Sequence, residues 1–149
     1  MKEKKITRYY RKANWLWKHR IPILPGVIMR VCRVLYSIDL PFTCDIGKGV
    51  EFQHNGLGCV IHSRAVIGDG TKIYQNVTIG GRNGRGYPVI GKNVFIGAGA
   101  CVLGGITIGD NAVIGANATV IEDVPCNCVV VGNKAQVVSK VCIDNDSQD

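Results

Sequence analysis

The sequence lacks several features that mark other classes of protein. No apolar run approaches the length of a bilayer-spanning helix, which excludes a transmembrane segment. The seven cysteines are odd in number, are scattered through the chain and include no Cys-x-x-Cys pair. Because no cleavable signal peptide is recognised either, we expect free thiols in a reducing cytoplasm.

Histidine is also scarce. Only three histidines are present, and His19 belongs to a basic N-terminal segment, which leaves His54 and His62 for the rest of the chain. Two histidines are too few for a three-histidine zinc site. We therefore expect no bound metal.

Acidic residues are nearly absent from the first part of the chain. Residues 1–35 contain ten lysines and arginines against Glu3 alone, whereas the remaining residues contain eight against ten acidic residues. The formal net charge of +7 therefore resides in the N-terminal segment. It says little about an active site elsewhere, and no nucleic-acid partner is expected.

The sequence does contain a six-residue period of apolar side chains. Ten leading positions follow it with one interruption: Ile61, Ile67, Ile73, Ile79, Ile90, Ile96, Val102, Ile108, Ile114 and Val120. A smaller set follows four residues after most of them: Ala65, Thr71, Val77, Val94, Ala100, Ile106, Ala112 and Ala118. Neither a helix nor an alternating strand has this period, which is typical of a parallel β-helix. We therefore predict a mainly β fold in which three hexads close one triangular coil.

This pattern divides the chain into three segments. Residues 1–38 form a basic helical segment, residues 39–138 the β-helix domain and residues 139–149 an acidic tail. The repeats suffice for little more than three coils, and so thin a prism buries little surface by itself. We therefore expect a homo-oligomer, most simply a homotrimer around a three-fold axis.

The N-terminal segment has the pattern of two amphipathic helices. From about residue 4 to residue 20, one face carries Ile6, Tyr9, Tyr10, Ala13, Leu16 and Trp17. A second helix is predicted over residues 26–37, with five inward positions: Val27, Ile28, Val31, Val34 and Leu35. Such helices commonly cap the first coil or pack between subunits. The alternative is peripheral contact of residues 4–20 with an anionic membrane surface, at the inner face of the membrane.

Two insertions interrupt the six-residue period, and such insertions in solenoids commonly build the binding site. The period lengthens by three residues after Phe52 and by five residues after Ile79. The first insertion contains His54, and a histidine with a near-neutral pKa can accept a proton from a hydroxyl group. The second spans residues 80–88 and is rich in glycine, so its exposed N–H groups can hold an oxyanion or a phosphate.

Three motifs carry a family resemblance. Residues 54–61 read His-x-Gly-x-Gly-x-Val-Ile, and Ala-Val-Ile-Gly at 65–68 and Val-Thr-Ile-Gly-Gly at 77–81 follow. Together they resemble the hexapeptide-repeat acetyltransferases, in the branch of serine acetyltransferases and their polysaccharide-modifying relatives. The likeness spans about residues 39–135. It implies a left-handed β-helix, a trimeric core, acetyl-CoA in the groove between neighbouring prisms, and direct acyl transfer without a covalent enzyme intermediate.

The resemblance assigns catalytic roles to two residues. His54 matches the general base of the family, and Asp39 matches the carboxylate that orients it, at the same separation of fifteen residues. An aspartate bonded to one ring nitrogen would fix the tautomer and stabilise the imidazolium. The alternative for Asp39 is an ordinary residue of the turn into the β-helix.

The resemblance also implies positions for the acyl donor. Gly80 and Gly81 match the loop whose backbone meets the thioester, and Ala98 and Ala116 match small positions beside the pantetheine arm. Simple packing at the corners also explains the two alanines. Lys134 stands near the place of a family residue that faces the CoA phosphates, within a motif that departs from the family pattern.

Other departures concern the acceptor. Serine acetyltransferases have an aspartate before the base and an Arg-His pair before a proline, where this chain has Gln53 and Gly86-Tyr87. Neutral side chains cannot pair with both charges of an amino acid. Gln53 and Tyr87 instead suit hydrogen bonding or stacking on a sugar, and His62 is interpreted as structural or substrate-lining.

Three functions follow. The first is an acetyl-CoA-dependent O-acetyltransferase acting on a sugar hydroxyl of a surface polysaccharide or its precursor. The second is a serine O-acetyltransferase that feeds cysteine synthesis, which would need other charged partners such as Arg82, Arg85 or Glu51. The third is a non-catalytic scaffold, which has no use for a base with its orienting carboxylate.

Overall fold

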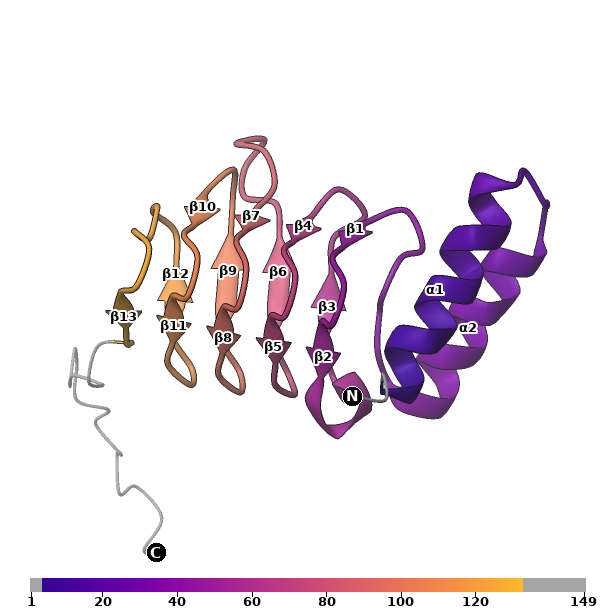
Figure 1. Ribbon diagram of the computed structural model, residues 1–149, viewed down its shortest axis with the longest axis horizontal. Helices are drawn as coiled ribbons and strands as arrows, with labels where there is room; N and C mark the ends of the chain where they lie inside the picture. Colours follow the sequence, from indigo (N-terminus) through magenta and orange to yellow (C-terminus); the bar gives the residue numbers. More distant parts are fainter. Residues whose placement is uncertain (1–3, 133–149) are drawn as a thin grey trace, which may run out of the picture.

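The computed structural model describes residues 4–132, which form two helices followed by a prism of short strands (Figure 1). Helix α1 spans Lys5–Lys18, and helix α2 spans Leu24–Tyr36. The strands are β1 (Asp45–Ile46), β2 (Glu51–Phe52), β3 (Val60–Ile61), β4 (Val66–Ile67), β5 (Lys72–Ile73), β6 (Thr78–Gly80), β7 (Val89–Ile90), β8 (Phe95–Ile96), β9 (Cys101–Leu103), β10 (Thr107–Ile108), β11 (Val113–Ile114), β12 (Thr119–Val120) and β13 (Val129–Val130). A short 3₁₀ turn, η1 (Gln53–Gly56), separates β2 from β3.

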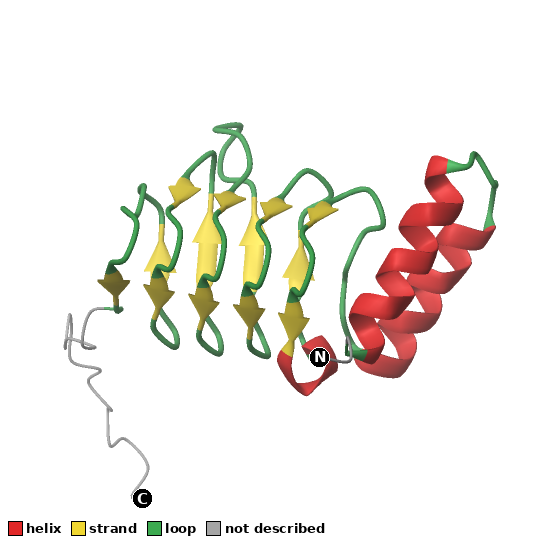
Figure 2. Cartoon of the chain, viewed as in Figure 1, coloured by secondary structure: helices red, strands yellow, loops and turns green. Residues whose placement is uncertain are grey.

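The strands stack in three parallel sheets that form the sides of the prism (Figure 2). The sheets have the orders β1-β4-β7-β10, β2-β5-β8-β11-β13 and β3-β6-β9-β12. Each strand therefore pairs with the strand three places further along the chain for most of the prism. This is the parallel β-helix that the six-residue period predicts.

The core consists of the residues that define the period. All ten leading aliphatic side chains are buried, and so is every member of the smaller set that follows them. Burial of each isoleucine stabilises the fold by about 1.5–3 kcal/mol. Each six-residue repeat contains one strand, with one inward side chain, and the corner that follows it. One repeat therefore forms one side of the prism.

Asparagines hold several corners in the left-handed backbone conformation. The corner residues Asn76, Asn93, Asn111, Asn117 and Asn127 have φ between 53° and 59°. Asparagine tolerates this conformation better than most residues do. Neighbouring coils are joined at one corner by side-chain hydrogen bonds from Asn93 to Asn111 and from Asn111 to Asn127.

Helix α1 caps the first coil, as one of the two alternatives predicts. Thr7 Oγ1, the Tyr10 hydroxyl and the Asn14 amide donate hydrogen bonds of 3.1, 2.6 and 2.7 Å. Their acceptors are the carbonyl oxygens of Val50, Cys44 and Phe42, respectively. No coil precedes these carbonyls, so α1 supplies the hydrogen bonds that they would otherwise lack.

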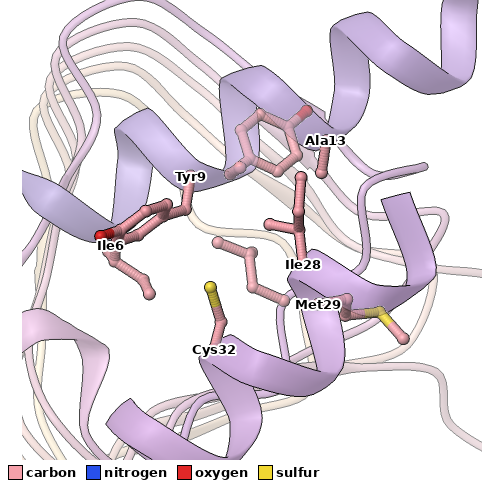
Figure 3. Close-up of a pocket in the computed structure, with 8 residues that line it drawn as sticks. Ile6, Tyr9, Ala13, Ile28, Met29 and Cys32 are labelled. Carbon is pink, nitrogen blue, oxygen red and sulfur yellow. The ribbon is translucent and has the colours of Figure 1, made fainter. Parts of the chain in front are cut away.

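Helix α2 packs against α1. Ile6, Tyr9 and Ala13 of α1 face Ile28 and Cys32 of α2 (Figure 3). The void between them is about 10 Å³, at the lower limit of what a single water molecule needs. This interface is therefore packing between two helices and has no room for a ligand.

The predicted burial of α2 is wrong at four of its five positions. Val27, Val31, Val34 and Leu35 are exposed, and Ile28 alone packs against the core. The helix has apolar residues around much of its circumference, so its pattern could not indicate which side meets α1. In α1, Tyr9 and Trp17 of the predicted face are partly exposed, and Thr7 is buried instead.

Several predictions concern residues beyond Gly132. Lys134, the domain boundary at residue 138 and the tail of residues 139–149 lie outside the described residues. Within residues 4–132, all six cysteines are free.

Candidate active site

His54 lies in η1, the turn that carries the chain from β2 to β3. The backbone φ angles of His54 and Asn55 are 51° and 56°, a region that residues other than glycine rarely adopt. The Gly58 N–H anchors the turn by donating to Ser37 O at 2.9 Å. The His54 side chain is exposed, and the centre of its ring lies 6.3 Å from that of Tyr74. Asparagine tolerates this conformation, but a histidine held in it at a corner is the kind of strain that clusters at functional sites.

Asp39 lies directly beside β3, close to the start of the prism. Its N–H donates to Cys59 O at 2.8 Å, and its carbonyl accepts from the Ile61 N–H at 2.9 Å. Its carboxylate forms an ion pair of 3.5 Å with Arg33 of α2. Within residues 4–132 no hydrogen bond joins this carboxylate to His54, so their pairing stays a prediction.

His54, Ala98 and Ala116 share one edge of the prism. At this edge the chain passes from the β2-β5-β8-β11-β13 sheet to the β3-β6-β9-β12 sheet. The Asn117 N–H donates to Ala98 O at 2.8 Å, which places the two alanines in successive coils. Because coils repeat about every 4.8 Å, Ala98 stands about 10 Å and Ala116 about 15 Å from the level of His54. Small side chains along this edge leave room for an extended ligand that ends near His54.

Gly80 and Gly81 lie at the opposite edge of the β3-β6-β9-β12 sheet. Here the chain leaves β6, forms the loop of residues 81–88 and enters β7, whereas η1 lies at the other end of the strands (Figure 1). The loop is fixed to the next coil, because the Gly105 N–H donates to Arg85 O at 2.7 Å. A single chain therefore does not bring together the two insertions that interrupt the period.

An aromatic and cationic cluster stands at the base of this loop. The rings of Tyr87 and His62 stack with centroids 4.0 Å apart, and Arg64 Cζ lies 5.5 Å from the Tyr87 centroid. The Arg64 N–H donates to His62 Nδ1 at 3.1 Å, so the proton of neutral His62 resides on Nε2. Within residues 4–132, neither Arg64 nor the loop residues Arg82 and Arg85 form an ion pair.

Sequence reasoning missed Arg64 and Arg33. The pairing of Val66 with Val89 in strands β4 and β7, followed two residues back, sets Arg64 opposite Tyr87. The register of the strands could thus have indicated Arg64. The contact of Arg33 depends on how α2 packs, for which the sequence has no local signal.

The neutral residue that precedes the candidate base is hydrogen-bonded to a carboxylate. Gln53 Nε2 donates to Glu51 Oε2 at 2.9 Å, and η1 begins at Gln53. Glu51 is half-buried at the start of β2. This carboxylate is a negatively charged group within two residues of the position where the family has its aspartate.

The sequence of this chain is similar to those of known enzymes. Residues 87–122 match the family described as bacterial transferase hexapeptide (six repeats). A serine acetyltransferase of Helicobacter pylori (strain ATCC 700392 / 26695) is 39% identical over 134 residues, which cover 88% of this chain and 78% of that protein. The chain belongs to the hexapeptide-repeat acetyltransferases. A serine acetyltransferase of Synechococcus elongatus is 38% identical over 143 residues, or 94% of this chain, but the chain spans only 58% of that relative.

Solved structures of this family confirm the left-handed parallel β-helix. The serine acetyltransferase of Brucella abortus strain S19 superposes with a TM-score of 0.81 at 30% identity, covering 91% of this chain and 55% of that one. A serine acetyltransferase in complex with CoA gives 0.79 at 33% identity, covering 89% and 55%. Soybean serine acetyltransferase complexed with serine gives 0.80 at 37% identity, covering 89% and 56%.

Proposed function

We propose that this hexapeptide-repeat acetyltransferase transfers the acetyl group of acetyl-CoA to the hydroxyl group of L-serine. The observation that carries the proposal is the 39% identity to the Helicobacter pylori serine acetyltransferase across 78% of that protein. The likeness to serine acetyltransferases solved with CoA and with serine supports the same donor and acceptor. These relatives favour serine over the sugar acceptor expected from Gln53 and Tyr87, and they give no support to a scaffold.

In this proposal His54 is the general base. It accepts the proton of the serine hydroxyl as the oxygen attacks the thioester carbonyl, and it returns that proton to the departing thiolate. Asp39 positions the ring and stabilises the imidazolium. Backbone N–H groups of Gly80 and Gly81 stabilise the oxyanion of the tetrahedral intermediate.

The donor would lie along the edge that His54 shares with the two alanines. Ala98 and Ala116 give the pantetheine arm a smooth path toward the base, and their separation along the edge suits an extended chain. Lys134, outside the described residues, stays the candidate partner for the CoA phosphates.

The proposed site needs two chains. His54 and the loop of residues 81–88 lie at opposite edges of one sheet, so the loop that meets His54 belongs to a neighbouring copy. A homotrimer with cyclic symmetry repeats this contact three times. Val60, Val66 and Val89 point outward on two sides of the prism and are exposed in the single chain, which suits such contacts.

The charges of serine then find partners at unexpected positions. Glu51, which is hydrogen-bonded to Gln53, would pair with the ammonium group of serine in place of the missing aspartate. Arg64, Arg82 and Arg85 of the neighbouring copy would supply a cation for the carboxylate in place of the missing Arg-His pair.

A sugar hydroxyl is the second candidate acceptor. The stacked rings of Tyr87 and His62 form a flat aromatic surface of the kind that packs against sugar rings, and Gln53 is neutral. The two candidates differ in one chemical requirement, because only serine needs groups of both charges.

The test is acetyl transfer followed by mass spectrometry. The purified protein is incubated with acetyl-CoA and L-serine, L-serine amide, or a panel of nucleotide sugars and oligosaccharides. We expect O-acetylserine from L-serine and far less product from the amide, which lacks the carboxylate. Acetylated sugar with inert serine would overturn the serine proposal and favour the second candidate.

The substitution Glu51→Gln separates the two acceptors further. Loss of a charged partner should raise the KM for L-serine about 10- to 100-fold and leave the KM for acetyl-CoA unchanged. Glu122→Gln, at an exposed position, is the matched control. An unchanged KM for serine would show that Glu51 does not hold the ammonium group.

A further inference from the structure

Helix α2 has a second apolar face that the rest of the described chain leaves uncovered. It consists of Leu24, Val27, Val31, Val34 and Leu35, which we call the outer stripe. Their exposed fractions run from 41% at Val27 to 81% at Val34. The spacing of three, four, three and one places them on one side of a helix, whereas Pro25 and Cys32 occupy the buried side. A contiguous apolar stripe of this length marks an interaction surface.

A row of cations on α1 lies beside helix α2. Lys5, Arg8 and Lys12 follow one another at spacings of three and four on α1, and together with Tyr36 of α2 they line a groove of about 210 Å³. A second groove, of about 590 Å³, lies between Lys12 and Trp15 of α1 and Leu24 of α2. This second groove combines apolar side chains with Lys12, and it shares Leu24 with the outer stripe.

The charge of this segment has a single sign. Residues 4–38 contain nine lysines and arginines and no aspartate or glutamate. A second copy docked on the outer stripe would bring two such segments together without any carboxylate to pair with, which like-charge repulsion disfavours. A surface that is both anionic and apolar can pair with the cations and bury the outer stripe at the same time.

The turn between the helices adds apolar anchors. Ile23 is 81% exposed, and its φ of 69° is an uncommon conformation for a β-branched residue. Trp15 and Trp17 of α1 are about half exposed. Tryptophan is enriched at the boundary between lipid and water. Within residues 4–132 neither helix is long and apolar enough to cross a membrane, so any lipid contact of these helices is at the surface.

We propose that the two N-terminal helices bind the surface of an anionic lipid bilayer. The outer stripe enters the boundary between headgroups and acyl chains, and Lys5, Arg8 and Lys12 contact lipid phosphates. In the proposed trimer the three helix pairs lie at the same end of the assembly, so three weak contacts act together. The surface is separate from His54 and the loop of residues 81–88, and it does not depend on which acceptor the enzyme uses.

The test uses the protein's own tryptophans. The chain has only two, Trp15 and Trp17, so fluorescence reports on the N-terminal helices alone. The full-length protein is mixed with vesicles of phosphatidylcholine, either pure or containing phosphatidylglycerol, and is followed by emission spectra and co-sedimentation. We expect a blue shift and co-sedimentation with the anionic vesicles only, and weaker binding as salt is raised.

Variants separate the apolar from the electrostatic contribution. Val34→Asp should weaken partition into anionic vesicles at least tenfold. The double substitution Lys5→Gln with Arg8→Gln should weaken it about 25-fold, since each cation near the surface contributes about fivefold. Val129→Asp, at an exposed apolar residue of β13 near the opposite end of the prism, should leave binding unchanged. All variants keep acetyl transfer and thermal unfolding as in the wild type.

Three results would overturn the proposal. The first is no binding to anionic vesicles at low salt, and the second is equal binding to pure phosphatidylcholine. The third concerns the wild-type protein without lipid. If light scattering gives it twice the mass of the Val34→Asp variant, a second copy occupies the outer stripe.

Discussion

Among single residues, His54 combines an exposed imidazole with a strained backbone at the corner of a rigid coil. A general base in this position contributes about 10²–10⁴-fold to the rate. We expect His54→Ala to lower kcat by that factor while the assembly and its melting temperature stay unchanged. His19→Ala, an exposed histidine at the end of α1, is the control, and full turnover by His54→Ala would remove His54 from the mechanism.

Cys44 and Tyr10 make stability depend on alkaline pH. Burial raises the pKa of the Cys44 thiol from 9.0 to about 12, and its Sγ donates to Pro41 O at 2.8 Å. Burial also raises the pKa of Tyr10, whose hydroxyl donates to Cys44 O. Both groups fold in their protonated forms, so their contribution is complete below pH 9 and is lost as pH rises toward 12.

We therefore expect the free energy of unfolding, from urea titrations, to fall as pH rises above about 9. Cys44→Ala should make that fall shallower, whereas Cys126→Ala, at an exposed position, should leave its slope unchanged. A free energy of unfolding that is constant from pH 8 to 11 in the wild type would contradict this account.

At the scale of elements, the corners are packed as tightly as the strands. A Cβ added to Gly97 would stand 2.6 Å from the backbone nitrogen of Ala116 in the next coil. Backbone cannot yield as a flexible side chain does, so Gly97→Ala should destabilise the fold by about 1–3 kcal/mol. Gly26→Ala in α2, where the added atom meets nothing within 4 Å, should stabilise it by up to about 1 kcal/mol. Urea denaturation measures the free energy of unfolding of both variants. If Gly97→Ala is no less stable than Gly26→Ala, the coils can move apart more easily than their contacts indicate.

At the scale of the whole molecule, the proposed site can be tested by mixing two inactive proteins. One carries His54→Ala, and the other carries Arg64→Ala with Tyr87→Ala at the base of the loop. A mixed trimer contains one interface in which an intact His54 meets an intact loop, so co-expression should restore part of the activity. Native mass spectrometry verifies that mixed trimers of the 16.1 kDa chain form. If mixed trimers form but stay inactive, each site lies within one chain.

Much of this architecture follows from the sequence by itself. The six-residue period predicts the β-helix because each hexad encodes one inward side chain and one corner, a relation that is local in the chain. The interruptions after Phe52 and Ile79 mark both segments of the candidate site for the same reason, since each lengthens one coil. The charge of residues 1–38 is likewise independent of folding.

Other properties arise only in three dimensions. That His54 shares an edge with Ala98 and Ala116, while the loop of residues 81–88 lies at the other edge, depends on which sheet each strand joins. The ion pair of Asp39 with Arg33 and the exposed outer stripe depend on how the helices pack. Helix α1 occupies the end of the prism, so α2 packs mainly against α1. Helical periodicity indicates that a face is apolar, but only long-range packing decides whether anything covers it.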